Sequence, residues 1–234
     1  MDVQSNLAFE FEHLPSPRRR TSAIEIAQGR VLVRTPMQVS IAHLQPWLKE
    51  REAWVISHLT KQQSSIDAHR IEMSQGASIP INGDKYDLYW RFSDRSSLVW
   101  HPQEIEVFLP HHMYDNPQAY VRRLLQAELK QKAAHQFQIA LTHLSAKTGL
   151  KPKKIEVKSY RRRWGQCSSD KIITLNWRLI HARPDVQRYV MIHELCHLQE
   201  MNHSVRFWSW VARFCPNHRE LSAELRDKSS WLQW

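Results

Sequence analysis

The sequence predicts an α+β fold whose first half is rich in strands and whose second half is helical. Short runs of alternating apolar and polar residues between about residues 23 and 115 are typical of half-buried strands. From about residue 116 onward, apolar residues recur mainly at helical spacing. No Pro-, Gly- or Ser-rich linker separates the halves, so we expect a single domain over residues 23–234, with a β-rich subdomain at about 23–115.

In the first half, turn and capping residues indicate where the predicted helices and strands begin and end. Residues 1–22 contain two prolines and an arginine run, and are expected to form a flexible N-terminal arm. Ser40 can cap a helix that extends to about Gln62. Gln28-Gly29 and Asn82-Gly83 both mark hairpin turns. The predicted strands are a pair with Ile24, Ile26, Val31 and Val33, a pair within Gly76–Trp90, and the runs Leu98–Trp100 and Ile105–Leu109.

In the second half, a long helix is predicted from Pro117 to about Lys147. Proline is favoured at the first helical position, and Gly149 is suited to end the helix. Two strands follow and are joined through Trp164-Gly165, and three helices complete the chain. The strands are Lys154–Tyr160 and Ile172–Leu175, and the helices run from Asp185 to about Glu200, from Ser204 to Phe214, and from Asn217 to about Lys228.

The positive charge of the chain is concentrated in one segment, residues 147–183. The whole chain carries a formal charge of +10, and eleven Lys or Arg residues lie in this segment against only Glu156 and Asp170. Such a segment attracts anions, although a solvated surface would have the same composition. Five glycines in the whole chain leave no room for a glycine-rich phosphate loop.

The chain shows the features of a protein from a reducing compartment. No apolar run approaches the ~18 residues of a membrane span, and the N-terminus does not resemble a signal peptide. The expected location is therefore cytoplasmic, with no membrane contact. The three cysteines argue against a disulfide framework. Cys167 could be a regulatory thiol or a small, partly buried residue.

The clearest motif is His193-Glu194-Leu195-Cys196-His197, an H-E-x-x-H sequence within the helix predicted from Asp185. Residues four apart share a helix face, so the two histidines can bind one Zn²⁺ ion. Glu194 can act as general base toward a water that the zinc activates. The motif lies in an apolar helix, where unpaired polar groups would be costly to bury and metal binding removes that cost.

A catalytic zinc usually has three protein ligands and one open position. His203 lies six residues after His197, the spacing of the metzincin pattern, but Glu200 replaces the glycine of that pattern and no convincing Met-turn follows. The chain would reverse in some other way, for which Asn202 is a candidate because Asn tolerates left-handed backbone. Glu220 and Glu224 are alternative third ligands.

Several short motifs occur in order around this site. They are Arg163-Trp164-Gly165-Gln166-Cys167-Ser168, Leu175-Asn176-Trp177-Arg178-Leu179-Ile180, Tyr189-Val190 before the H-E-x-x-H sequence, Asn202-His203-Ser204, and Phe207-Trp208. In this combination the chain resembles the YgjP-like metallopeptidase family, which is related to the SprT-like zincins. The resemblance implies a zincin-like fold, metal ligands His193, His197 and His203, and Glu194 as the catalytic residue.

Two enzyme classes and one binding class follow from these observations. The first is a zinc-dependent metallopeptidase that acts on a peptide or protein, in the vicinity of nucleic acid if the basic segment binds it. The second is a zinc-dependent phosphohydrolase, such as a nucleotide triphosphate pyrophosphatase, in which arginines hold phosphate. The third is a nucleic-acid-binding module with a structural zinc. The residues expected to contact nucleic acid or nucleotide are Arg161, Arg162, Arg163 and the neighbouring lysines.

Overall fold

The computed structural model describes residues 6–27 and 29–234. The chain divides into two compact units, the first ending at His69 and the second covering Arg70–Trp234. This differs from the expected division at about residue 116. The reason is that the strands between residues 77 and 110 bury their apolar side chains in the same core as the helix that follows them.

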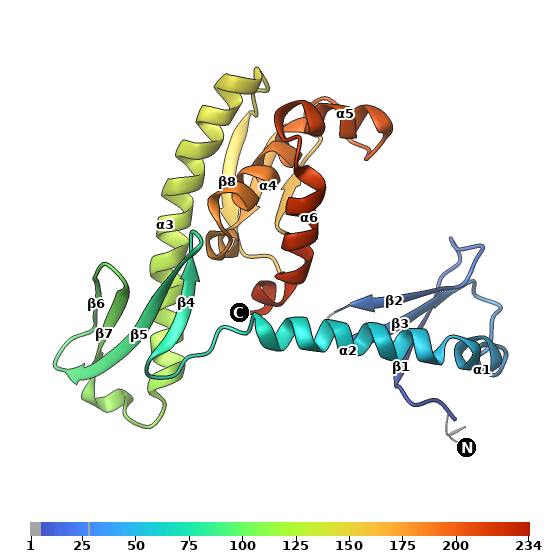
Figure 1. The fold of residues 1–234 in the computed structure, drawn as a ribbon, viewed down its shortest axis with the longest axis horizontal. Helices are drawn as coiled ribbons and strands as arrows, with labels where there is room; N and C mark the ends of the chain where they lie inside the picture. Colours follow the sequence, from blue (N-terminus) through green and yellow to red (C-terminus); the bar gives the residue numbers. More distant parts are fainter. Residues whose placement is uncertain (1–5, 28) are drawn as a thin grey trace. The chain divides into compact units, whose positions relative to one another are not determined.

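The first unit is a three-stranded sheet with two helices (Figure 1). Its strands are β1 (Phe11–Pro15), β2 (Ala23–Ala27) and β3 (Arg30–Thr35), and its helices are α1 (Ile41–Glu50) and α2 (Glu52–Ala68). The order is β1-β3-β2, with β1 parallel and β2 antiparallel to β3. Val31 and Val33 of β3 are buried with Leu44, Leu48 and Val55 of the helices.

Two expectations for this unit require correction. The expected flexible arm over residues 1–22 contributes strand β1, which pairs with β3 along its whole length; residues 1–5 lie outside the described residues. The helix expected from Ser40 to about Gln62 is two helices that meet at Arg51. Ser40 does cap the first of them, since its hydroxyl accepts a hydrogen bond from the His43 amide. The predicted hairpin forms, although Gln28 of its turn is not among the described residues.

The second unit begins with a four-stranded sheet in the order β4-β5-β7-β6. The strands are β4 (Ala77–Ile81), β5 (Asp84–Ser93), β6 (Ser97–Trp100) and β7 (Glu104–Pro110). The turn at Asn82 and Gly83 has φ angles of 54° and 93°, which suits Asn-Gly in a hairpin. A single turn of 3-10 helix at His111–Met113 leads into the long helix α3 (Pro117–Thr148).

Helix α3 forms the centre of the second unit (Figure 1). One face is fully buried over its whole length, and the helix ends at Gly149, whose φ of 74° is the left-handed conformation that glycine favours. The buried residues of that face are Val121, Leu125, Leu129, Ala133, Phe137, Leu141 and Ser145. The helix therefore links the β4–β7 sheet to the remaining helices through one continuous core.

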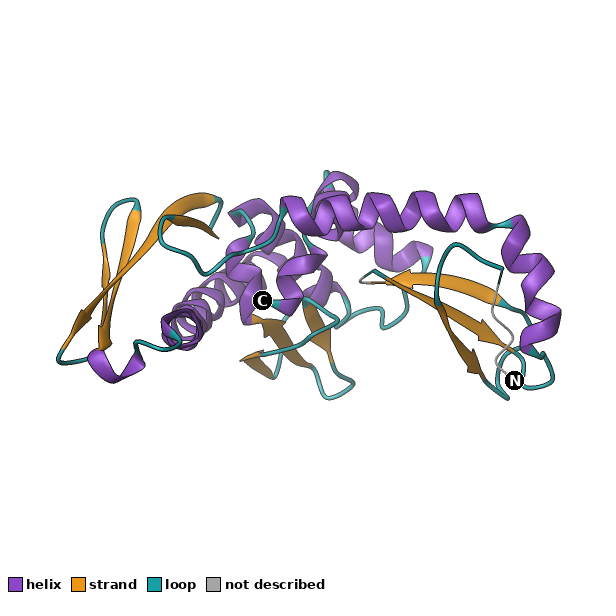
Figure 2. Ribbon diagram, turned by 90° about the horizontal axis from the view of Figure 1, so that it is seen from below, coloured by secondary structure: helices purple, strands orange, loops and turns teal. Residues whose placement is uncertain are grey.

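The rest of the second unit contains the candidate site. A small sheet with the order β8-β10-β9 is formed by β8 (Lys154–Lys158), β9 (Gly165–Cys167) and β10 (Ile172–Asn176). Helices α4 (Pro184–Cys196), α5 (Val205–Phe214) and α6 (His218–Asp227) follow, with 3-10 segments at Trp177–His181 and Ser229–Gln233. Figure 2 shows the helical and strand segments by colour. Among the described residues, no helix combines the length and the apolar character needed to cross a membrane.

Candidate active site

Helix α4 holds the H-E-x-x-H motif rigidly because it is buried on several sides. Tyr189, Val190, Ile192 and Leu195 are all buried. Contrary to the expectation that this helix runs to about Glu200, it ends at Cys196, and His197 is its C-terminal cap. The early end allows the chain to turn back toward the helix.

The turn after α4 returns His203 to the other two histidines. Hydrogen bonds from the backbone of residues 198–200 to that of residues 195 and 196 tighten the end of the helix. Ser204 then caps α5 by accepting a hydrogen bond from the Phe207 amide at 3.3 Å. Asn202 does not provide a left-handed residue, since Asn82 and Lys171 are the only described non-glycine residues with positive φ.

His193, His197 and His203 form a compact cluster. One ligand atom of each imidazole lies within 4.8 Å of the other two. The Nε2 atoms of His193 and His203 are 3.1 Å apart. Two nitrogens bound to one tetrahedral zinc at about 2.0–2.1 Å would lie about 3.3–3.4 Å apart. This pair therefore has nearly the spacing of two histidine ligands of one zinc ion.

Neighbouring groups orient the imidazoles. The Nδ1 of His197 donates to the Glu200 carbonyl oxygen at 3.0 Å, which leaves Nε2 unprotonated and able to bind a metal. The buried Phe207 ring packs on all three imidazoles, with centroid separations of 4.9, 4.5 and 4.8 Å to His193, His197 and His203. The group that orients the His197 ring is thus the backbone carbonyl of Glu200, the residue that replaces the metzincin glycine.

Burial keeps two imidazoles of the cluster, those of His193 and His197, in the neutral form. Burial, together with the nearby His197 and His203, lowers the pKa of His193 to about 3. Burial also lowers the pKa of His197. Both imidazoles are therefore neutral near pH 7, and only neutral imidazole binds a metal ion.

Glu194 is a buried carboxyl group beside this cluster, with only 6% of its surface exposed. Burial raises the pKa of Glu194 to about 8, and the positive charge of Arg163 acts in the opposite direction. Raised carboxyl pKa values of this kind are typical of groups that transfer protons near neutral pH.

Strand β9 packs directly on Glu194. A Cβ atom added at Gly165 would lie 2.6 Å from the Glu194 Oε1 atom and 2.8 Å from its Cγ atom, closer than real Cβ contacts allow. Glycine at this position therefore makes room for the glutamate side chain. The segment was expected only as a connection between strands; it is instead a short edge strand, antiparallel to β10.

A buried asparagine shapes the loop that contains the three arginines. The Asn176 side-chain amide donates to the carbonyl oxygens of Tyr160 and Arg163, at 2.8 and 2.9 Å. Arg163 in turn donates to the Gln166 side chain at 2.6 Å. Asn176 belongs to a motif that supports the family resemblance, but its role depends on contacts that cannot be predicted from the sequence.

The alternative ligands and the basic segment lie in other surroundings. Glu220 is exposed on α6, and Glu224 pairs with Arg183 and Lys228. Among the described residues, neither belongs to the three-histidine group that could hold a metal ion. The basic segment is partly neutralised, since Lys154 and Lys158 pair with Glu156 and Arg183 pairs with Asp185 and Glu224. The side chains of Arg161, Arg162 and Arg163 are exposed.

Cys167 lies on β9 near the candidate site. Burial, and secondarily the charge of Glu194, raises its pKa to about 11. The thiol is therefore protonated at neutral pH, and a protonated thiol is a weak nucleophile and a weak metal ligand. This environment favours the interpretation of Cys167 as a packing residue.

Comparison with known proteins identifies the family. The YgjP-like metallopeptidase domain matches residues 20–228, nearly the whole chain. The solved structure of the metallopeptidase zymogen abylysin of Pyrococcus abyssi is similar, with 23% identity, a TM-score of 0.36, and coverage of 39% of this chain and 92% of abylysin. The zymogen jannalysin of Methanocaldococcus jannaschii is similar as well, with 17% identity, a TM-score of 0.36, and coverage of 39% and 95%. No curated protein matches the chain significantly.

The family match covers both the H-E-x-x-H helix and the sheet beside it. It agrees with the resemblance seen in the ordered motifs of residues 161–208, and with a mixed fold of helices and small sheets. The chain belongs to the YgjP-like metallopeptidase family.

Proposed function

We propose that the protein is a zinc-dependent metallopeptidase in which His193, His197 and His203 bind zinc and Glu194 is the general base. The observation that carries this proposal is the convergence of three imidazoles beside a buried carboxyl group. Three histidines fit zinc better than magnesium or calcium, which prefer oxygen ligands. His203 is exposed, as expected of a site with an open position for substrate.

In the proposed reaction, the zinc ion and the residues of the chain have different roles. Zinc, when bound, is a Lewis acid that polarises a carbonyl group and makes water acidic near neutral pH. Glu194 accepts the proton of the attacking water and delivers it to the leaving amine. Gly165 leaves room for the Glu194 side chain against β9, and a larger residue there would displace this proton acceptor.

The edge of β9 is suited to align an extended peptide. The Asn176 amide donates to the Trp164 carbonyl oxygen, and the Ser168 amide to the Ile172 carbonyl oxygen. Bonded pairs alternate along an antiparallel ladder, so the N–H and C=O groups of Gly165 and Cys167 point away from β10. A substrate strand could bind these groups, as in other proteins that add a peptide to a sheet edge.

The proposal is tested with the substitution Glu194→Gln in the full chain. This change keeps the size of the side chain and removes the proton acceptor. We expect the variant to retain about one zinc per chain and to lose on the order of 10²–10⁴-fold in peptide hydrolysis. Elemental analysis and peptide hydrolysis are the measurements. Unchanged hydrolysis would eliminate Glu194 as the base and would favour a structural zinc.

The phosphohydrolase remains a second candidate because of one observation. The positive charge of Arg163 acts on Glu194, and its exposed side chain would favour an anionic substrate near the site. Nucleoside triphosphates therefore belong in the same assay. Release of pyrophosphate that requires Glu194, without cleavage of any peptide, would favour this candidate.

A further inference from the structure

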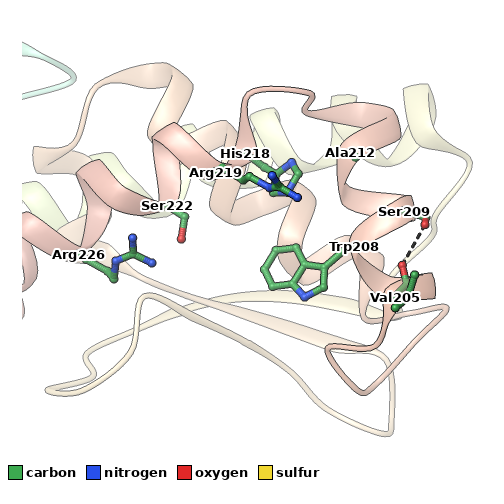
Figure 3. A pocket seen from close by; sticks show the side chains of 8 residues that line it. All are labelled: Val205, Trp208, Ser209, Ala212, His218, Arg219, Ser222 and Arg226. Atoms are coloured by element: carbon green, nitrogen blue, oxygen red, sulfur yellow. Dashed lines mark hydrogen bonds between the residues drawn. The ribbon is translucent and has the colours of Figure 1, made fainter.

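A pocket of about 650 Å³ lies between α5 and α6, and is separate from the histidine cluster itself. Its volume falls within the range of roughly 300–1,000 Å³ of ligand sites. Figure 3 shows the eight side chains that line it. They are Val205, Trp208, Ser209, Ala212, His218, Arg219, Ser222 and Arg226.

Trp208 connects this pocket to the proposed metal site. Its ring centroid lies 5.9 Å from that of His193 and 5.8 Å from that of His203. It also contacts the rings of Phe207, at 5.1 Å, and of His218, which stacks on it at 5.5 Å with an angle of 20° between the rings. The Nδ1 of His218 donates to the Cys215 carbonyl oxygen at 3.1 Å, which fixes the stacked ring. A substrate residue beside the cleaved bond can therefore reach the pocket across Trp208.

Helix α6, which forms one wall of the pocket, packs against α4. The Ser222 side chain lies close to the hydroxyl group of Tyr189. The Tyr189 ring lies 6.0 Å from that of His193. The position of α6, and of the groups it presents to the pocket, is thus determined by the same helix that contains the H-E-x-x-H motif.

The charge of the pocket is positive. Arg219 and Arg226 line it, and none of its eight lining residues is acidic. Among the described residues, neither arginine forms an ion pair, and the nearby Glu224 is paired with Arg183 and Lys228. The two arginines are seven positions apart in the helix, which corresponds to about 10 Å along its axis, and Figure 3 shows them on either side of Ser222.

We propose that this pocket binds an acidic side chain of the peptide substrate, next to the bond that is cleaved. This inference rests on the proposed peptidase function and names its substrate class. The indole of Trp208 contacts the apolar part of a glutamate side chain, and the guanidinium groups of Arg219 and Arg226, on either side of Ser222, offer two positions where its carboxylate can bind. Both arginines are exposed, so the effect is moderate and decreases with salt.

Binding is measured first, with the zinc-loaded Glu194→Gln chain, which cannot consume the peptide. The probes are two fluorescent peptides that differ only in Glu or Gln at the positions that flank the cleavable bond. We expect the Glu peptide to bind about 10-fold more tightly at low salt. Equal affinity would overturn the proposal. So would equal displacement of the Glu peptide by a single-stranded oligonucleotide of the same charge, because the pocket would then be a general anion site.

The double substitution Arg219→Gln and Arg226→Gln tests whether these two arginines bind the acidic side chain. It should reduce the affinity for the Glu peptide to that for the Gln peptide and leave the Gln peptide unaffected. The matched control is Arg213→Gln, an exposed arginine on α5 that does not line the pocket. A Glu preference that survives the double substitution would overturn the assignment.

Hydrolysis by the wild-type chain separates this inference from the proposed function. Preferential cleavage of Glu peptides, abolished by the double substitution, supports both. Cleavage at the same rate for Glu and Gln peptides would overturn the pocket assignment and leave the peptidase function intact. Arginine-dependent binding of Glu peptides without any cleavage would overturn the peptidase function and leave the pocket as a binding site for acidic peptides.

Discussion

Gly165 and Glu194 are in contact across two elements that the sequence separates by 29 positions: a Cβ atom at Gly165 would lie 2.6 Å from the Glu194 carboxylate. Both residues lie in rigid surroundings, one in a sheet and the other in a buried helix. A larger residue at 165 would have to move Glu194, since the space between them is already filled.

The substitution Gly165→Ala is therefore expected to displace Glu194 and to reduce peptide hydrolysis by at least about 10-fold, because the proposed general base loses its position. Zinc content should be unchanged. Gly149→Ala is the control: it has no atoms near its added Cβ and costs only backbone strain, from its φ of 74°. It should lower stability and preserve activity, and a Gly165→Ala enzyme that is fully active would disprove the role of this contact.

Replacing each histidine of the cluster by alanine should lower the zinc content of the purified protein. His203 is the informative position, because it is exposed and its place in the cluster depends on the turn after α4. Elemental analysis is the measurement, and His143→Ala on α3 is the control, since it lies outside the cluster. Full zinc occupancy in His203→Ala would contradict the three-histidine site and redirect attention to Glu220 and Glu224.

The basic segment is tested by changing Arg161, Arg162 and Arg163 together to glutamine. If these exposed arginines bind nucleic acid, the slope of log affinity against log salt should become shallower by about 2–3. The run Arg18–Arg20 is a matched control with the same loss of charge, in the other compact unit. Equal effects of the two triple substitutions would show that only net charge matters, and the segment would then be a solvated surface.

His181 is expected to make stability depend on pH. Its side chain is almost completely buried against Trp177, Trp231 and Trp234, and its Nδ1 donates to the Pro80 carbonyl oxygen at 2.7 Å. Burial lowers the pKa of His181 from its ordinary value of 6.5 to about 4. The unfolded chain therefore binds a proton at a higher pH than the folded chain. The stabilising contribution is fully present above about pH 6.5, and up to about 3 kcal/mol is lost as the pH falls toward 4.

Urea unfolding at several pH values between 4 and 7 measures this effect. His193 and His197 have lowered pKa values and contribute in the same direction, so the comparison is between the wild type and His181→Gln. We expect the variant to be less stable at pH 7 and to show a weaker dependence on pH. The same dependence in both proteins would show that His181 is not the responsible group.

Most secondary structure could be predicted because it depends on local residues. Asn82-Gly83 adopts the hairpin turn, Gly149 ends α3, and Ser204 caps α5, since each preference acts over a few positions. The two histidines of α4 could likewise be paired from helical geometry alone. Strand β1 could not be predicted, because only its pairing with β3 makes it a strand.

The sequence by itself determined the chemical groups of the candidate site, whereas the tertiary structure decided their arrangement. The residue types and their spacing in the sequence identified His193, Glu194 and His197 as candidate site residues. The choice of His203 over Glu220 and Glu224 required the turn after α4, and the pairing of Glu224 with Arg183 required α6 to pack near the start of α4. The contact of Gly165 with Glu194 and the approach of Trp208 to the histidines likewise join segments far apart in the chain. Such contacts arise when separate apolar faces pack into one core, and no local spacing in the sequence encodes that packing.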